Sequence, residues 1–260
     1  MTVPRITVTA PVGPSGAPLL LLGPSLGTST ILWENVIPLL QTSHRVVAWD
    51  LPGHGTAPAP TEGFTVAELA DAVADAAAGL DADSIRYAGI SLGGAVGIEL
   101  LLRHPSLVDA AAIMCSGAKI GDAAAWEGRA RQVRQMGTGT LIVGSAERWF
   151  APGSMEREPV LTGRLLHALR DADDAGYAFC CDALAEFDVR DRLGEISAPV
   201  LAAWGEYDEV TPESSAAEIA TGVRHGKTVR IADAAHLPAA EQPQAVASVL
   251  TAFFAEEAAR

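Results

Sequence analysis

The sequence predicts an α/β protein in which a mostly parallel sheet is flanked by helices and carries one helical insertion. Over most of the chain, short apolar runs typical of strands buried on both faces alternate with segments of helical length. Between about Lys119 and Arg192 the helical pattern continues, but no run suits a buried strand. We therefore predict a core formed by residues 1–118 and 193–260 and a helical cap formed by residues 119–192.

The predicted core strands follow from the apolar runs, each short enough for a strand and bounded by turn residues. In chain order they are Leu19–Leu22, Arg45–Trp49, Ile85–Ala88, Ala110–Met114, Val200–Trp204 and Val229–Ile231. Apolar residues at helical spacing predict core helices over Val66–Leu80, behind Thr65 as N-cap, and over Gln242–Ala255. The same pattern predicts cap helices over Arg129–Met136, Leu161–Asp171 and Tyr177–Glu186.

Composition limits the possible partners and the compartment. The 260 residues, 49% of them hydrophobic, suffice for one sizeable core, and the formal net charge of −14 would repel nucleic acid and anionic membranes. We found no signal-like segment, no run of about 18 apolar residues and no zinc-like spacing of the three cysteines. We expect a soluble cytoplasmic protein with reduced thiols, a small-molecule substrate and no nucleic-acid or membrane partner, and the oligomeric state stays open.

The predicted cap differs in charge from the rest of the chain. Residues 119–170 contain eight Lys or Arg against five Asp or Glu, whereas the remaining residues contain ten against twenty-seven. A locally basic segment on an acidic protein favours an anionic ligand at the cap.

The strongest chemical signal is the stretch RYAGISLGGAVG, which contains a Gly-x-Ser-x-Gly pattern centred on Ser91. A strand is predicted before it and a helix after it, and this context is typical of a sharp turn that exposes a nucleophilic serine. The glycines permit the cramped backbone, and the amide of Leu92 lies at the helix N-terminus. We therefore predict that Ser91 is a nucleophile.

A serine needs a base and an acid that orients the base, and both follow in the expected order along the chain. Asp208 comes in the loop after the strand ending at Trp204, and His236 comes in the loop after the strand ending at Ile231. We predict that His236 moves the proton and that Asp208 holds its imidazole. Glu206 and Asp233 lie close by in sequence and remain alternatives as the acid.

These motifs resemble those of the α/β-hydrolase fold family along almost the whole chain. The resemblance implies that a second oxyanion donor follows the strand Leu19–Leu22, where the family often has His-Gly and this chain has Pro24-Ser25-Leu26. The amides of Leu26 and Leu92 would then stabilise a carbonyl oxygen as it becomes negative. In the matching DLPGHGTAPAP loop, we interpret His54 as a structural residue.

Four further stretches resemble the 3-oxoadipate enol-lactonases. They are SLGTS near the start and, in the cap, KIGDAAAWEGRARQVRQMG, RWFAPGSMEREPVL and GYAFCCDALAEFDVR. The resemblance implies a carboxylated enol-lactone opened through an acyl-enzyme, with no metal or organic cofactor. It also implies that Ser25, Trp126, Arg129 and Trp149 contact the substrate, with Arg129 binding the carboxylate.

The same machinery also serves other reactions, so alternatives remain. Another lactonase, a carboxylesterase and a carbon–carbon bond hydrolase all fit the same three predicted catalytic residues, because the cap decides the substrate. A receptor that keeps the pocket without turnover belongs to a different class of protein.

Overall fold

The computed structural model describes residues 3–259 and contains one seven-stranded sheet in the order β1-β3-β2-β4-β5-β6-β7. All neighbouring strands pair in parallel except the edge pair β1 and β3. The strands are β1 (Thr7–Val8), β2 (Leu19–Gly23), β3 (Arg45–Asp50), β4 (Ile85–Ile90), β5 (Val108–Met114), β6 (Val200–Gly205) and β7 (Gly226–Ile231). The predicted α/β class with a mostly parallel sheet is confirmed.

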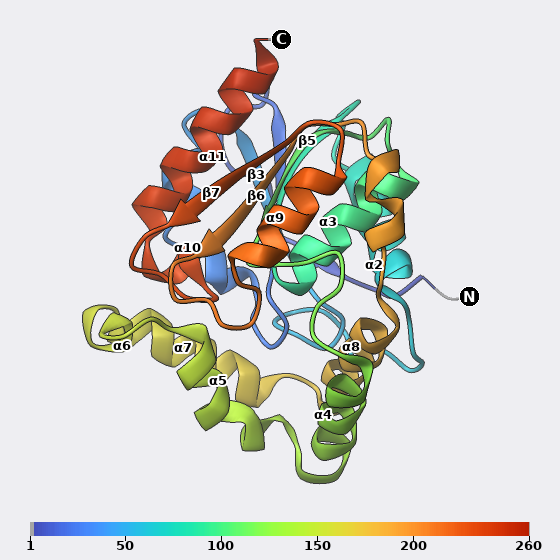
Figure 1. Cartoon of the computed structure of the whole chain (residues 1–260), viewed down its shortest axis with the longest axis vertical. Coiled ribbons are helices and arrows are strands. Elements are labelled where there is room, and N and C mark those ends of the chain that lie inside the picture. The colour runs from blue at the N-terminus through green and yellow to red at the C-terminus, as the bar shows by residue number, and fades with distance from the viewer. Residues whose placement is uncertain (1–2, 260) are drawn as a thin grey trace.

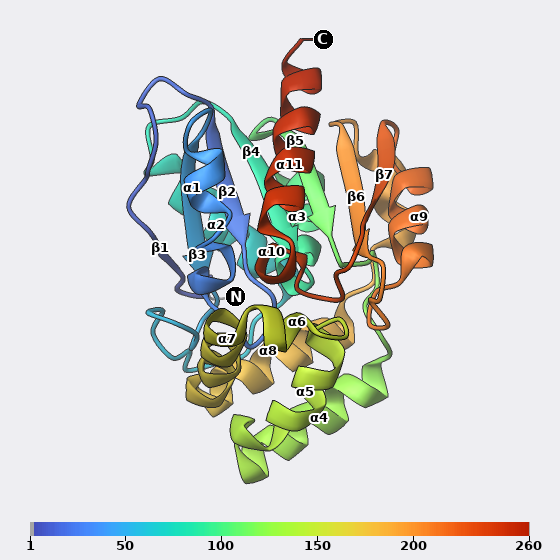
Figure 2. The same ribbon diagram turned by 90° about the vertical axis from the view of Figure 1, so that its left-hand side faces the viewer.

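Helices cover both faces of the sheet (Figures 1 and 2). One face carries α2 (Val66–Ala78), α3 (Leu92–Arg103) and α9 (Glu213–Gly222), and the other carries α1 (Ile37–Leu40) and α11 (Pro243–Ala258). Three short helical segments, η1 (Thr30–Trp33), η3 (Arg190–Glu195) and α10 (Pro238–Glu241), complete the core. As predicted, Thr65 caps α2: its hydroxyl accepts from the amide of Glu68 at 3.1 Å, and the carboxylate of Glu68 accepts from the amide of Thr65.

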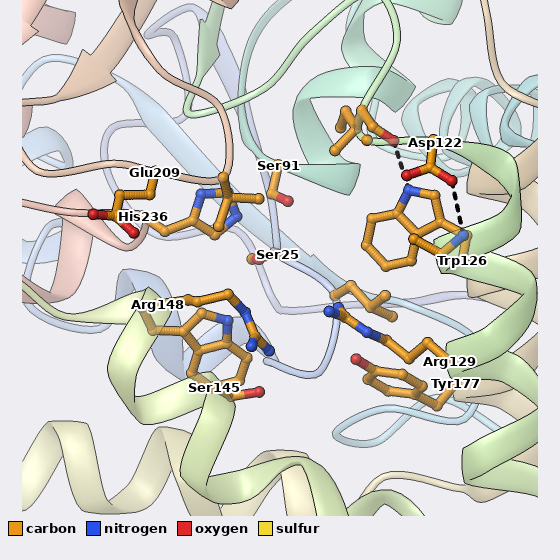
Figure 3. A pocket seen from close by; sticks show the side chains of 16 residues that line it. Ser25, Ser91, Asp122, Trp126, Arg129, Ser145, Arg148, Tyr177, Glu209 and His236 are labelled. Carbon is orange, nitrogen blue, oxygen red and sulfur yellow. Dashed lines mark hydrogen bonds between the residues drawn. The ribbon is translucent and has the colours of Figure 1, made fainter.

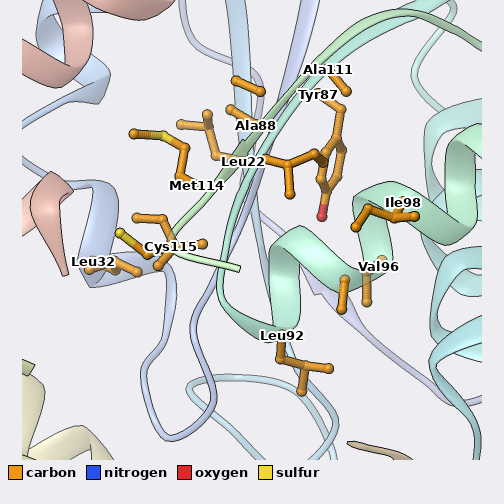
Figure 4. Packing of buried hydrophobic residues seen from close by; sticks show 14 of the residues in the cluster. Leu22, Leu32, Tyr87, Ala88, Leu92, Val96, Ile98, Ala111, Met114 and Cys115 are labelled. Atoms are coloured by element: carbon orange, nitrogen blue, oxygen red, sulfur yellow. The ribbon is translucent and has the colours of Figure 1, made fainter. Parts of the chain in front are cut away.

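The core is continuous on both sides of the central strands. Every residue of β2 is buried, as expected for a strand with helices on both faces, whereas β7 at the edge alternates between exposed and partly buried residues. Figure 4 shows Tyr87 of β4 on the side of α3, near Val96 and Ile98, and Met114 of β5 on the opposite side, near Leu32 and Cys115. The three cysteines are free thiols buried in this interior.

Between β5 and β6 the chain forms helices α4–α8, which lie across the carboxyl ends of the strands (Figure 1). They are α4 (Ala123–Met136), α5 (Ile142–Trp149), α6 (Ser154–Arg157), α7 (Pro159–Asp171) and α8 (Asp174–Glu186), with the turn η2 (Thr138–Leu141) before α5. Residues 119–192, all of which are described, contain no strand. We call α4–α8 the cap helices.

The structure corrects several predicted boundaries. Strand β1 was not predicted because it has only two residues, and β7 begins three residues earlier than expected because its edge position leaves polar residues in the strand. Helix α4 begins at Ala123 because the carboxylate of Asp122 accepts from the amide of Ala125 at 3.0 Å. The sequence patterns also missed α1, α5, α6, α9 and α10.

Within residues 3–259, every helix is either too short or too polar to cross a membrane.

Two glycines give opposite expectations for stability. A Cβ at Gly205, the last residue of β6, would overlap the carbonyl oxygen of Ala235, whereas a Cβ at Gly163 within α7 would meet no atom within 4 Å. We expect Gly205→Ala to lower the free energy of unfolding by about 1–3 kcal/mol through overpacking. Gly163→Ala should raise it by about 0.5–1 kcal/mol. Urea unfolding measures both, and equal effects of the two changes would contradict the expectation.

Candidate active site

Ser91 lies on a sharp turn between β4 and α3. Its backbone angles are φ +57° and ψ −118°, in a region that residues other than glycine rarely adopt. A Cβ at Gly93 would lie only 2.6 Å from the carbonyl oxygen of Pro24, so the turn cannot form without a glycine there. The amide of Ser91 donates to Met114 at 3.0 Å, and the hydroxyl of Ser116 donates to the carbonyl of Ser91 at 2.8 Å. These bonds hold the strained turn at the carboxyl end of the sheet.

Asp208 and His236 come from the loops that follow β6 and β7, and their side chains meet. The imidazole Nδ1 lies 3.1 Å and 3.0 Å from the two carboxylate oxygens of Asp208. Because a carboxylate only accepts, Nδ1 carries the proton and leaves Nε2 free to accept one. Figure 3 shows His236 and Ser91 at the same end of one cavity.

The carboxylate of Asp208 is buried and well supplied with donors. It accepts from the amides of Val210 and Thr211 at 2.9 Å and 3.1 Å and from the hydroxyl of Thr211 at 2.8 Å. Burial alone would raise the pKa of Asp208, but the attraction of His236 and the hydrogen bonds from His236 and Thr211 lower it below its ordinary value. Asp208 therefore stays ionised beside the imidazole.

The alternative acids lie elsewhere. The carboxylate of Glu206 accepts from the amide of Asp233 at 3.1 Å and pairs with Arg230 at 3.3 Å, both at the surface. Among the hydrogen bonds of residues 3–259, none joins Glu206 or the side chain of Asp233 to His236. His54 is buried, with its Nδ1 donating to the carbonyl of Pro52 at 3.0 Å, and it does not line the cavity.

The turn after β2 approaches the turn at Ser91. The amide of Gly93 donates to the carbonyl of Pro24 at 2.9 Å, and the carbonyl of Ser25 accepts from the amide and hydroxyl of Thr28 at 3.0 Å and 2.7 Å. Gly27 adopts the left-handed φ of +81° that this turn needs. Within the described chain, the amides of Leu26 and Leu92 donate to no protein group. Both amides remain available to a substrate oxygen.

A cavity of about 290 Å³ joins these groups to the cap helices. Of the residues predicted from the sequence, those that line it are Ser25, Leu26, Ser91, Trp126, Arg129, Trp149 and His236. Asp208 lies behind His236, and Leu92 lies beneath Ser91 as the first residue of α3. The structure therefore brings the whole predicted set to one place.

The end of the cavity formed by the cap is positively charged. Arg129 of α4 stacks on the ring of Trp126 at 4.8 Å from its centre, and Arg148 of α5 points into the same space (Figure 3). Asp122 and Glu209 also line the cavity, but within residues 3–259 neither arginine forms an ion pair. Burial and the charge of Arg129 lower the pKa of Arg148. Two neighbouring cations that form no ion pair with the described residues favour an anionic ligand.

Sequence reasoning missed the other described residues that line this cavity, which are Ile120, Gly121, Asp122, Ala125, Ser145, Arg148, Tyr177, Glu209 and Val210. Ser145, Arg148 and Trp149 lie three and four positions apart, so they share one face of α5. That spacing was the available signal, but α5 itself was not predicted. Tyr177 was expected only as part of a cap helix, and burial raises its pKa and keeps the phenol protonated.

Known proteins are similar to this chain in both sequence and structure. A model of the alpha/beta hydrolase fold matches residues 18–135. The 3-oxoadipate enol-lactonase 2 of Acinetobacter baylyi is 35% identical over 236 residues, which cover 91% of this chain and 88% of that protein. The 3-oxoadipate enol-lactonase 1 of the same organism is 30% identical, with 93% and 90% covered.

A solved structure agrees with these sequence relatives. The crystal structure of the enol-lactonase from Burkholderia xenovorans superimposes with a TM-score of 0.92 at 28% identity and covers 96% of both chains. The identity to the first relative extends over nearly the whole length of both proteins, including the cap helices. This chain therefore belongs to the α/β-hydrolase fold family.

Proposed function

We propose that this protein is a serine hydrolase that opens 3-oxoadipate enol-lactone to 3-oxoadipate through an acyl-enzyme. One observation carries the proposal: a small cavity has Ser91 and His236 at one end and two arginines without counter-ions at the other. A lactone that also bears a carboxylate fits both ends. The names of the two Acinetobacter relatives and of the Burkholderia structure support this substrate.

The reaction starts at the hydroxyl of Ser91. Nε2 of His236 takes its proton while the oxygen attacks the lactone carbonyl carbon, and Asp208 stabilises the imidazolium that forms. The carbonyl oxygen becomes negative and accepts hydrogen bonds from the free amides of Leu26 and Leu92. These two donors are already in place, so the protein needs little reorganisation as negative charge develops on the carbonyl oxygen.

The tetrahedral intermediate then breaks the bond between the carbonyl carbon and the ring oxygen. That oxygen leaves as an enol, taking the proton from His236, and the opened chain stays attached to Ser91 as an ester. Water, deprotonated by His236, attacks the ester carbon, and the oxygen of Ser91 recovers its proton as the acid departs. The released enol tautomerises to the ketone.

The cap supplies the specificity in this proposal. Arg129 and Arg148 bind the substrate carboxylate with forked donors, while the rings of Trp126 and Trp149 form the walls around the lactone. The volume of about 290 Å³ restricts the cavity to small substrates. We also propose that residues 119–192 act as a cap on the core and that the enzyme works in the cytoplasm without a nucleic-acid partner, in keeping with its net charge of −14.

The decisive experiment follows the loss of ultraviolet absorbance of freshly prepared 3-oxoadipate enol-lactone. The wild-type protein should remove the absorbance rapidly, and Ser91→Ala should leave only a small residual rate, because the acyl-enzyme cannot form. An activated neutral ester is assayed beside the lactone. Cleavage of the ester without loss of the lactone would contradict the substrate and retain the serine mechanism.

The two arginines give a prediction about substrate binding. Arg129→Ala and Arg148→Ala should each raise KM for the enol-lactone about 10- to 100-fold, because each removes a hydrogen bond to a charged group and the binding free energy that it contributes. KM for a neutral activated ester should change little, because that substrate has no carboxylate. Arg131→Ala, on the exposed face of α4 beside Glu127, is the matched control. Equal increases with both substrates would show that the arginines only shape the cavity.

Replacing the orienting carboxylate gives a prediction about kcat. Asp208→Asn keeps the shape but removes the charge and favours the wrong tautomer of His236, so kcat should fall about 10⁴-fold. Asp233→Asn, in the same loop as His236, should retain wild-type kcat. Stopped-flow and steady-state kinetics on the activated ester measure both variants. A comparable loss of kcat in Asp233→Asn would show that Asp208 is not the residue that orients His236.

A further inference from the structure

Another buried carboxylate, Glu241, lies five residues after His236 at the end of α10 and is 6% exposed. One of its oxygens, Oε1, accepts from the amide of Ala151 at 2.6 Å and from the hydroxyl of Ser154 at 2.7 Å. The other oxygen, Oε2, accepts from the amide of Ala235 at 2.8 Å. This carboxylate takes no part in the proposed chemical steps.

The three donors belong to two different parts of the molecule. Ala151 lies between α5 and α6 of the cap and Ser154 is the first residue of α6, whereas Ala235 directly precedes His236. A further bond joins the same two parts, because the amide of Leu237 donates to the carbonyl of Trp149 at 3.2 Å. The loop that carries the imidazole is therefore linked to the cap directly at Leu237 and, through the carboxylate of Glu241, at Ala235.

Ser154 is oriented for this contact by Arg157 of α6. Nη2 of Arg157 donates to the hydroxyl oxygen of Ser154 at 2.9 Å. Since that oxygen already accepts from Arg157, the hydroxyl proton is directed to Glu241. Arg157 belongs to the stretch MEREP, which thereby takes part in the connection between cap and core.

A carboxylate suits this position because both of its oxygens accept. Burying an ionised group is costly unless donors satisfy it, and three short bonds satisfy this one. A glutamine of the same shape has one accepting oxygen, and its amino group would face a donor on one side. It would therefore lose the bond either to the cap or to the loop of His236.

We propose that Glu241 is a positioning residue that ties the cap wall to the loop of His236 and thereby holds the imidazole between Asp208 and Ser91. This inference rests on the proposed role of His236 as the base. The bonds of Glu241 then affect the rate of the chemical steps as well as the stability of the fold. A displacement of about 1 Å in a catalytic group can lower the rate on the order of 100-fold.

The test is Glu241→Gln in the full-length protein, assayed with an activated neutral ester. We expect kcat to fall about 10- to 100-fold, as for other residues that orient a catalytic group, while KM changes less than about threefold. Proton NMR supplies a second readout, because the proton on Nδ1 of His236 bonded to Asp208 resonates far downfield. In Glu241→Gln this resonance should shift or broaden, and in Asp208→Asn it should be lost.

Two further variants keep the test decisive. Glu206→Gln makes the same chemical change beside the same loop, at an exposed carboxylate bonded to Asp233, and should keep wild-type kcat and the wild-type resonance. Ser154→Ala removes only a cap donor and should lower kcat several-fold, so it tests the inference even if Glu241→Gln does not fold. Wild-type kcat and an unmoved resonance in Ser154→Ala, or in a folded Glu241→Gln, would overturn the positioning role.

The choice of ester separates this inference from the proposed substrate. If the wild-type protein cleaves the activated ester but leaves the enol-lactone intact, the substrate is wrong and the comparison of Glu241→Gln with wild type still stands. If Ser91→Ala cleaves the ester as fast as wild type, His236 is not acting as the base of Ser91 and the positioning role is overturned with it.

Discussion

The site depends on the close approach of two turns that leave adjacent parallel strands. Gly23 of β2 pairs with Gly89 of β4 at the end of the ladder, so both chains leave the sheet at the same level. The amide of Gly93 then reaches the carbonyl of Pro24, at a separation that admits no side chain between them. The two free amides belong to Leu92, which directly precedes Gly93, and to Leu26, two residues after Pro24. A slip of one residue in the register would separate them, because each residue advances about 3.3 Å along a strand.

The parallel order of these strands also explains which parts of the site could be predicted. Ser91, Asp208 and His236 each follow a predicted strand, and the carboxyl ends of parallel strands meet at one edge of a sheet, so sequence position alone predicted that these residues lie close together. The choice of Asp208 over Glu206 and Asp233 depended on the position of Asp208 in the loop after β6. The structure adds the hydrogen bond between Asp208 and His236, which the sequence could only suggest. Strands β1 and β7 lie at the sheet edges, where fewer residues are buried, so their hydrophobic patterns are weaker. Strand β1 was therefore not predicted, and β7 was predicted too short.

The cap was harder because its helices are held by packing across the chain and not by strong local patterns. Arg148 and Ser145 lie on α5, an eight-residue helix whose N-cap makes no side-chain hydrogen bond and which follows a turn containing Gly137 and Gly139. Their place in the cavity depends on how α5 rests against the core, and Glu241 is part of that contact. Neither the partner nor the distance of such a bond is visible in a linear pattern. The cation at Arg129 was predicted by resemblance, and its companion became evident only in three dimensions.

The cap is inserted between β5 and β6, which are themselves direct neighbours in the sheet. Its two ends therefore start and finish side by side, and the entropy of closing such a loop grows only slowly with its length. Evolution can accordingly exchange or resize the insertion with little cost to the sheet, which lets one catalytic core acquire many substrate ranges. The buried carboxylate below the cap limits that freedom. A replacement must bring its own donors to the same point, so new specificities are expected to arise more readily by changing residues on α4 and α5 than by grafting a foreign cap.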